Sequence, residues 1–232
     1  MSAISSTNTR ILVWDAPTRV FHWLLAASFA GAYLTSESER LLNIHLLFGY
    51  TLLGLIGFRL LWGLIGTRYA RFRSFAFRPV EVVAYLRSMV SRAPKHYVGH
   101  NPAGSWAIYL VLALGILCGI TGYLGEIDVG GDAMKELHES VAGGMLAVVV
   151  IHVSGVILSS LLHRENLVFG MISGYKRGTA PQGIRRAWPS VAIAIIALVV
   201  ALWSGAIPAP GLSDSAKVAQ AHRQGGKHAD RH

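Results

Sequence analysis

The sequence of 232 residues has few charged side chains and a single cysteine. Asp, Glu, Lys and Arg make up 14% of the chain, against about 25% in an ordinary soluble domain. Cys118 lies within an apolar run, and one cysteine excludes both a disulfide framework and a cysteine-ligated cluster. HExxH motifs, CxxC motifs and internal repeats are also absent from the sequence. The common zinc motifs and a repeat architecture are therefore not indicated.

What the sequence does contain is apolar length. Hydrophobic residues make up 53% of the chain, and its mean hydropathy is +0.46. Crossing the hydrocarbon of a bilayer takes about 20 mostly apolar residues. Five segments meet this requirement, at 17–35, 41–66, 105–124, 137–162 and 188–207. These segments predict an all-α integral membrane helical bundle.

Charge alternates between the connections. The stretch 67–100 holds seven Lys and Arg with one acid, and 163–187 holds five with one acid. The stretches 36–40 and 125–139 are acidic instead. Basic connections face the cytoplasm, so we expect an inner-membrane protein of bacteria with its N-terminus cytoplasmic and its C-terminus periplasmic. The net charge of +9 reflects this asymmetry, and no basic patch on a soluble domain indicates nucleic-acid binding.

The remaining segments complete the predicted organisation. Residues 1–13 read as a cytoplasmic tail, and 79–91 as an amphipathic helix of the inner loop, either on the membrane surface or as a solvated connector. The fifth span, 188–207, has no histidine and has tryptophans near both ends, which is typical of an added membrane anchor. Residues 208–232 are rich in small and polar residues and are expected to form a flexible outer tail.

Four of the ten histidines lie within the predicted spans. His138 and His152 are fourteen positions apart, which on a helix is about 21 Å and within about 40° of the same face. With the predicted topology, His22 and His152 share an inner level, and His45 and His138 share an outer level. Each level therefore has two histidines from different helices.

A pair of imidazoles at each level favours haem over a bare metal. Zinc usually takes three or four protein ligands, whereas haem iron needs two axial ligands, and two imidazoles leave no open position for oxygen chemistry. Such sites suit electron transfer. A histidine-bearing transporter should carry carboxylates inside its spans, and none lies well inside one. An assembly protein without haem would not need the histidine pairs.

Small residues follow the histidines on the same faces. Gly49 lies four after His45, Ala26 four after His22, Ala142 four after His138 and Gly155 three after His152, and side chains of that size let a flat ring approach. Gly115, Gly119 and Gly122 form a stripe that either walls a haem or packs helices. Arg59 is the one cation well inside a span, since Arg19 lies at the start of the first, and it either pairs with a haem propionate or snorkels to the inner surface.

The ordered motifs resemble the bacterial di-haem cytochrome b561 superfamily, which includes the b-type cytochrome subunits of membrane-bound nickel–iron hydrogenases. They run from residue 14 to 178: "WDAPTRVFHW", "NIHLLFGY" with Arg59 downstream, "YVGHNPAG", "LHESVAGG" through His152, and "ISGYKRG". The resemblance implies a four-helix core, 14–178, holding two haem b groups. It assigns His22 and His152 to the inner haem and His45 and His138 to the outer one.

The resemblance also implies electron transfer between a partner protein and quinone. The partner would be a periplasmic c-type cytochrome, a hydrogenase or another dehydrogenase. The fifth span and the outer tail depart from the four-helix members and leave the partner open. For the quinone we expect a cytoplasmic-side pocket near the inner haem. The polar groups gathered at that level are Trp14, Asp15, Arg19, His96, His100 and Asn101.

Overall fold

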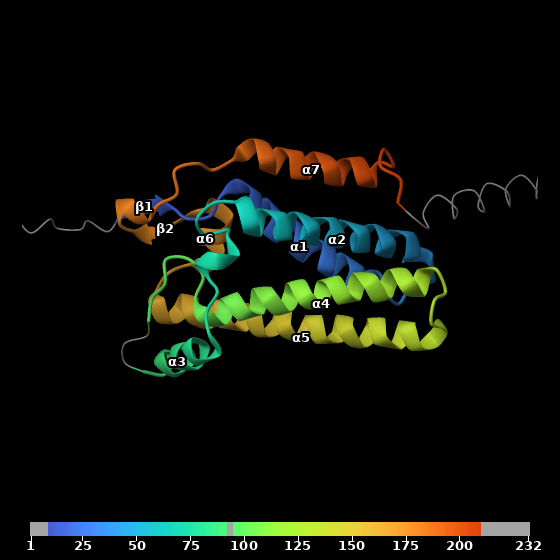
Figure 1. Ribbon diagram of the computed structural model, residues 1–232, viewed down its shortest axis with the longest axis horizontal. Coiled ribbons are helices and arrows are strands. Elements are labelled where there is room, and N and C mark those ends of the chain that lie inside the picture. The colour runs from blue at the N-terminus through green and yellow to red at the C-terminus, as the bar shows by residue number, and fades with distance from the viewer. Residues whose placement is uncertain (1–8, 92–94, 210–232) are drawn as a thin grey trace, which may run out of the picture.

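The computed structural model describes residues 9–91 and 95–209 of the chain. Helices dominate them (Figure 1). The long helices are α1 (Ala16–Thr35), α2 (Leu42–Ile65), α4 (Pro102–Glu126), α5 (Gly131–His163) and α7 (Pro189–Trp203). The shorter ones are α3 (Pro79–Met89) and α6 (Leu167–Ser173), with 3-10 turns η1 (Glu39–Leu41), η2 (Phe72–Ser74) and η3 (Ala180–Gln182). Each of the five predicted segments holds a helix, and the predicted tail lies largely outside the described residues.

Three of the described helical segments are long and apolar enough to cross a membrane, and they are Glu39–Ile65, Pro102–Glu126 and Gly131–His163. Helix α1 has 20 residues but falls outside this set, and α7 is a shorter apolar helix of 15 residues. The fold is therefore a helical membrane bundle, as predicted. The arrangement of four core spans plus a fifth stays a prediction.

The bundle is built from two helix pairs. Helix α1 packs on α2 and α4 packs on α5, while α2 joins the pairs by packing against α4 and α7 lies along α1 (Figure 1). The buried core side chains are Phe21, Phe29, Leu52, Leu55, Ile56, Leu112, Met145 and Ile195. Within the described residues, α5 does not pack closely against α1 or α2. The histidine-bearing face of α5 is therefore separated from the other helices that carry the predicted ligands.

The glycine stripe of α4 has two roles. A Cβ at Gly115 would lie 2.5 Å from Ile56 Cδ1, and one at Gly119 would overlap Leu53, both on α2. These two glycines bring α4 close to α2, so the helix-packing interpretation is the correct one for them. A Cβ at Gly122 would instead lie 2.9 Å from the ring of His138 on α5. The absence of a side chain there gives that imidazole its room.

One end of the bundle carries a small sheet that the all-α prediction lacked. Strand β1 (Thr9–Leu12), from the segment expected to be a tail, pairs antiparallel with β2 (Tyr175–Gly178). The sheet, α3 and α6 gather at the same end of the bundle (Figure 1). Both basic connections, 67–100 and 163–187, lie at this end, which is called the basic end below. The opposite end, at the connections 36–40 and 125–139, is called the acidic end.

Helix α3 forms close to where it was predicted. Pro79 starts it, and Glu81 Oε2 accepts a hydrogen bond from the Arg78 backbone N–H at 2.7 Å. Tyr85 is buried, and α3 packs against α4, while Val80 and Leu86 are exposed. This arrangement is compatible with a helix on the membrane surface and with a connector, so both interpretations stand.

Candidate functional site

The outer pair, His45 of α2 and His138 of α5, comes together at the acidic end. The two ring centroids are 6.2 Å apart, and the ring planes are inclined by 78°. His45 Nδ1 donates to the Ala32 carbonyl at 2.8 Å, and His138 Nδ1 donates to the Cys118 carbonyl at 2.9 Å. A carbonyl only accepts, so both rings carry their proton on Nδ1. Each Nε2 is therefore left with a free lone pair, the form that a metal ligand requires.

The separation of the outer pair fits one metal ion between the rings. A metal–imidazole bond is about 2 Å long, so two such bonds with half a ring on each side place the ring centres roughly 6 Å apart. The outer pair thus has both the spacing and the tautomers of a two-histidine site.

The inner pair, His22 of α1 and His152 of α5, lies nearer the basic end. The two side chains are near enough to interact electrostatically. His22 Nδ1 is buried without a hydrogen-bond partner, and its ring packs edge-on against Trp23 with centroids 5.0 Å apart. A buried polar atom without a partner is uncommon in proteins. The predicted partners by level are therefore brought toward each other in both pairs.

The surroundings of both pairs leave space for a flat group. A Cβ added at Gly49 of α2, or at Gly143, Gly144 or Gly155 of α5, would meet nothing within 4 Å. In the described part of the chain, no group of three or more His, Cys, Asp or Glu side chains gathers to hold an ion. Two imidazoles per level, glycine-lined helices and loose packing of α5 fit a haem at each level better than a bare ion.

Arg59 is buried rather than extended toward the surface. Arg59 belongs to α2, and the residue is 3% exposed. Its Nη1 donates to the Ala70 carbonyl at 2.8 Å. The guanidinium lies over the Phe72 ring at 4.9 Å and within 5.7 Å of the Phe75 ring. The guanidinium therefore reaches the loop after α2 at the basic end and is covered there. Its pairing with a haem propionate stays a prediction.

His100 lies deep at the basic end, beside the inner pair. Its ring packs against Phe75 with centroids 4.3 Å apart and against Trp14 at 4.6 Å, and its Nδ1 is buried without a partner. Burial, then the charge of Arg59, lowers the pKa of His100 to about 3. Its electrostatic neighbours include both inner histidines. His100 is therefore a neutral imidazole next to the inner level.

Asp15 proves to be a structural residue. It caps α1 as its sequence position suggested, with Oδ1 accepting from the Thr18 N–H at 2.8 Å. Its Oδ2 accepts from Trp62 Nε1 at 3.1 Å and from Thr67 Oγ1 at 2.5 Å, and the residue is 1% exposed. Asp15 thus ties the start of α1 to the end of α2 and is not available to a quinone.

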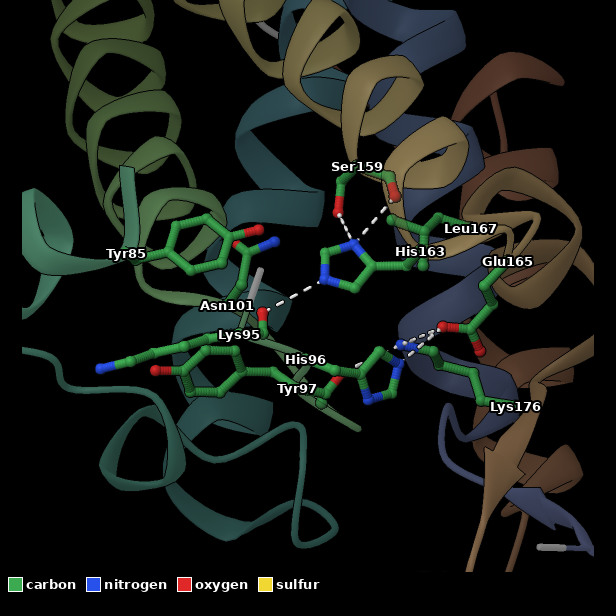
Figure 2. A pocket seen from close by; sticks show the side chains of 11 residues that line it. Tyr85, Lys95, His96, Tyr97, Asn101, Ser159, His163, Glu165, Leu167 and Lys176 are labelled. Carbon is green, nitrogen blue, oxygen red and sulfur yellow. Dashed lines mark hydrogen bonds and ion pairs between the residues drawn. The ribbon is translucent and has the colours of Figure 1, made fainter. Parts of the chain in front are cut away.

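The other expected quinone residues divide between structural and accessible positions. Trp14 is buried, Arg19 Nη1 donates to the Ile172 carbonyl, and Asn101 Oδ1 caps α4 through the Gly104 N–H. A pocket of about 280 Å³, part of which is open to solvent, is lined by His96 and Asn101 (Figure 2). It is also lined by Glu165 and Lys176, which the sequence analysis missed. The only sequence signal for Glu165 and Lys176 was that they are charged residues in the connection that follows an apolar span.

Fold and site together define a class, helical membrane proteins with histidines paired between helices at two levels. The comparisons with known proteins assign the chain to a family of helical membrane proteins. Residues 13–174 match the family described as prokaryotic cytochrome b561. The chain belongs to this family and is a membrane b-type cytochrome of electron transfer. The resemblance drawn from the motifs is thereby confirmed.

Curated relatives agree with the family. A protein of Azotobacter vinelandii is 26% identical, over 72% of this chain and 89% of its own length. One of Rhodobacter capsulatus is 24% identical over 72% and 82%, and one of Rhizobium leguminosarum bv. viciae is 27% identical over 71% and 87%. All three are named probable Ni/Fe-hydrogenase B-type cytochrome subunit. No solved structure matches the chain significantly.

Proposed function

We propose that the protein binds two haem b groups, each between two histidines, and carries electrons between a periplasmic redox partner and quinone in the bacterial inner membrane. The observation that carries this proposal is the outer pair: two rings 6.2 Å apart, each with Nδ1 bonded to a backbone carbonyl. The inner pair on α1 and α5 is its counterpart, with His22 Nδ1 buried and unbonded.

Haem supplies a one-electron couple to such a site, and two axial imidazoles keep the ligand set the same in both oxidation states. The chain's own residues orient the ligands and exclude water. The Ala32 and Cys118 carbonyls fix the tautomers of the outer pair, and the apolar helices exclude water. Since fourteen residues of α5 separate His138 from His152, the two levels lie about 21 Å apart along the helix, which provides a ladder across the bilayer.

Charge and the relatives support the proposed orientation in the membrane and the proposed partner. The basic end, with its Arg and Lys connections, is proposed to face the cytoplasm, so the acidic end would meet the partner. The relatives' printed name favours a nickel–iron hydrogenase as that partner. A c-type cytochrome or another dehydrogenase would use the same face. Quinone would then bind at the basic end, where the pocket with His96 and Asn101 lies.

Haem content of the purified protein tests the ligands. A reduced-minus-oxidised spectrum should contain a b-type α-band with two components. His45→Ala and His138→Ala should each remove one component, the same one, because the two side chains would hold one haem. His22→Ala and His152→Ala should each remove the other.

His163→Ala is the matched control, because His163 lies on α5 eleven residues beyond His152 and is not part of either pair. It should keep both components. If His22→Ala and His45→Ala remove the same component, the pairing by level is wrong. A wild-type protein without a b-type band would end the proposal altogether.

A further inference from the structure

A cluster of three ionisable side chains lines the pocket at the basic end, outside both histidine pairs (Figure 2). His96 Nε2 lies 3.1 Å from Glu165 Oε2, and Lys176 Nζ lies 3.4 Å from the same oxygen. The three residues come from three segments: the connection before α4, the turn after α5, and β2. Lys176 Nζ also donates to the Tyr97 carbonyl at 3.2 Å.

The cluster runs from solvent into the protein. The exposed fraction of the side chain falls from 46% at His96 to 16% at Glu165 and 4% at Lys176. A structural ion pair needs no such gradient. A path for protons does, because one end must exchange with water while the other reaches a site from which water is excluded.

The electrostatics of the inward end suit proton donation. Burial lowers the pKa of Lys176 below its ordinary value, and the nearby Glu165 carboxylate only partly opposes this. A buried ammonium group therefore releases its proton more easily than one in water. Glu165 Oε1 is buried and has no hydrogen-bond partner. This oxygen is an acceptor that a donor such as the hydroxyl of a quinol can satisfy.

The pocket also adjoins the inner level. Ser159 of α5 lines it, and it follows His152 by seven residues, about 10 Å along the helix. Lys176 is close enough to His100 to act on it electrostatically, and His100 is in turn coupled to both inner histidines. Its 280 Å³ includes open solvent and gaps between atoms, and the part comparable with a cavity volume is about 40 Å³. That space holds a few water molecules rather than a quinone ring, so the pocket brings water to the cluster.

We infer that His96, Glu165 and Lys176 form a proton relay that carries protons from this pocket to a quinone ring bound beside it at the basic end. The inference rests on the proposed function and adds the proton path to it. Forming one quinol takes two electrons from the inner level and two protons, one for each carbonyl oxygen. Each proton passes from Lys176 Nζ to a quinone oxygen and is replaced from His96 Nε2 through Glu165 Oε2, and His96 recovers it from water.

Lys176→Arg is the decisive variant. Arginine keeps the positive charge and can keep the ion pair with Glu165, but its guanidinium does not lose a proton near neutral pH. A purely structural role therefore survives the change, whereas a relay does not. The measurement uses full-length, haem-loaded protein in liposomes, reduced in advance with a stoichiometric amount of dithionite. Decylubiquinone is the probe, and stopped-flow absorbance follows oxidation of the protein.

We expect Lys176→Arg to slow this oxidation about tenfold or more, with haem content and reduced spectrum unchanged. The solvent isotope effect should rise, because proton delivery becomes limiting. Arg177→Met is the matched control. It removes the neighbouring cation of β2, which is exposed and does not line the pocket, and it should react at the wild-type rate.

His96→Asn is a second variant at the exposed end, where a substitution disturbs packing least. Its oxidation should also slow, and added imidazole should restore the rate by supplying the missing acid. Oxidation of Lys176→Arg within twofold of wild type overturns the relay and leaves the proposed function standing. If Lys176→Arg fails to load haem, a wild-type rate in His96→Asn overturns the relay instead. A wild-type protein that decylubiquinone does not oxidise overturns the quinone step of the proposed function, and the relay with it.

Discussion

Backbone carbonyls set the chemistry of the outer histidines at the scale of single residues. Ala32 lies in the last turn of α1, where carbonyls accept side-chain bonds, and Thr35 Oγ1 of the same turn donates to it at 3.1 Å. His45 Nδ1 fills that acceptor, which fixes its tautomer and at the same time joins α2 to α1. The Cys118 carbonyl does the same for His138 from inside α4. The packing of the helices thus fixes the tautomer of both rings.

Arg59 offers a prediction at this scale, because a buried cation beside the inner level acts on the charge there. Reduction adds an electron, so the reduced state is favoured by a nearby positive charge. Arg59→Leu should therefore lower the midpoint potential of the inner haem, by on the order of tens of millivolts. A spectroscopic redox titration measures it. Arg59→Lys, which keeps the charge, should stay near wild type, and unmoved potentials in Arg59→Leu would remove Arg59 from the inner level.

Glu165 gives the protein a pH dependence of its own. Burial raises the pKa of Glu165, but the hydrogen bond with His96 and the charge of Lys176 outweigh burial and hold the pKa below its ordinary value of 4.5. Because the folded-state pKa is depressed, the carboxylate stabilises the fold at pH above about 4.5, and this contribution is lost as the pH falls through the lowered pKa.

Glu165→Gln should accordingly unfold at a lower temperature than wild type at pH 7, and the difference should narrow toward pH 4. Thermal unfolding of the detergent-solubilised protein, followed by circular dichroism, measures both. Glu81→Gln is a control on α3, where the carboxylate bonds an exposed backbone N–H. A gap between Glu165→Gln and wild type that is as wide at pH 4 as at pH 7 would contradict the linkage.

At the scale of elements, Gly122 decides how closely α5 can approach α4. It lies four residues after Cys118, so the helical carbonyl that His138 reaches is next to a position without a side chain. A Cβ there would stand 2.9 Å from the imidazole. Gly122→Ala should therefore displace His138 from the Cys118 carbonyl and reduce the outer haem component selectively. Haem stoichiometry and the α-band of the purified variant measure the loss.

Gly54→Ala is the control for this substitution. Gly54 is also a helix glycine, but a Cβ there meets nothing within 4 Å, and it lies nine residues after His45, which is about half a turn away from that face. It should load both haems. Equal loss of both components in Gly122→Ala would indicate general misfolding rather than a change at one site.

Elements show where sequence reasoning succeeds and where it stops. Apolar length predicted the helices of the bundle, and helical periodicity predicted that His138 and His152 share a face. The β1–β2 ribbon escaped prediction, because each strand has four residues and the pairing of Thr9 with Gly178 depends on the fold of everything between them. The His96–Glu165–Lys176 cluster escaped for the same reason. Local patterns do not encode contacts between distant loops.

The outcome for Asp15 and Arg59 shows a second limit. A polar residue at a membrane boundary has the same sequence signature whether it binds a ligand, caps a helix or ties two elements together. Asp15 does the last two, and no spacing rule predicts the two hydrogen bonds that it accepts from Trp62 and Thr67. Arg59 was placed correctly within a span, but its aromatic neighbours come from the loop after α2 and became known only with the fold.

At the scale of the whole molecule, helix lengths do not match one another. Helix α5 has 33 residues, about 50 Å, which exceeds a hydrocarbon core of about 30 Å. Helix α7 has 15 residues, about 22 Å. Trp188, just before α7, packs on Trp62 near the basic end of α2, and Trp203 Nε1 donates to Thr51 Oγ1 at 2.9 Å. Thr51 lies about 13 Å from the acidic end of α2, so α7 stops short of that end.

This geometry makes the position of the C-terminus the sharpest test of the topology. We expect it outside, because the basic connection before α7 is proposed to face the cytoplasm and α7 runs from there toward the acidic end (Figure 1). Alkaline phosphatase fused after residue 232 should be active, since the enzyme needs disulfides that form in the periplasm and not in the cytoplasm. The same reporter fused after Arg186, before α7, should be inactive, and a fluorescent protein at that position should be bright. An inactive fusion after residue 232 with a normal haem spectrum would mean that α7 enters the membrane without crossing it, and the core would then have four spans without a fifth.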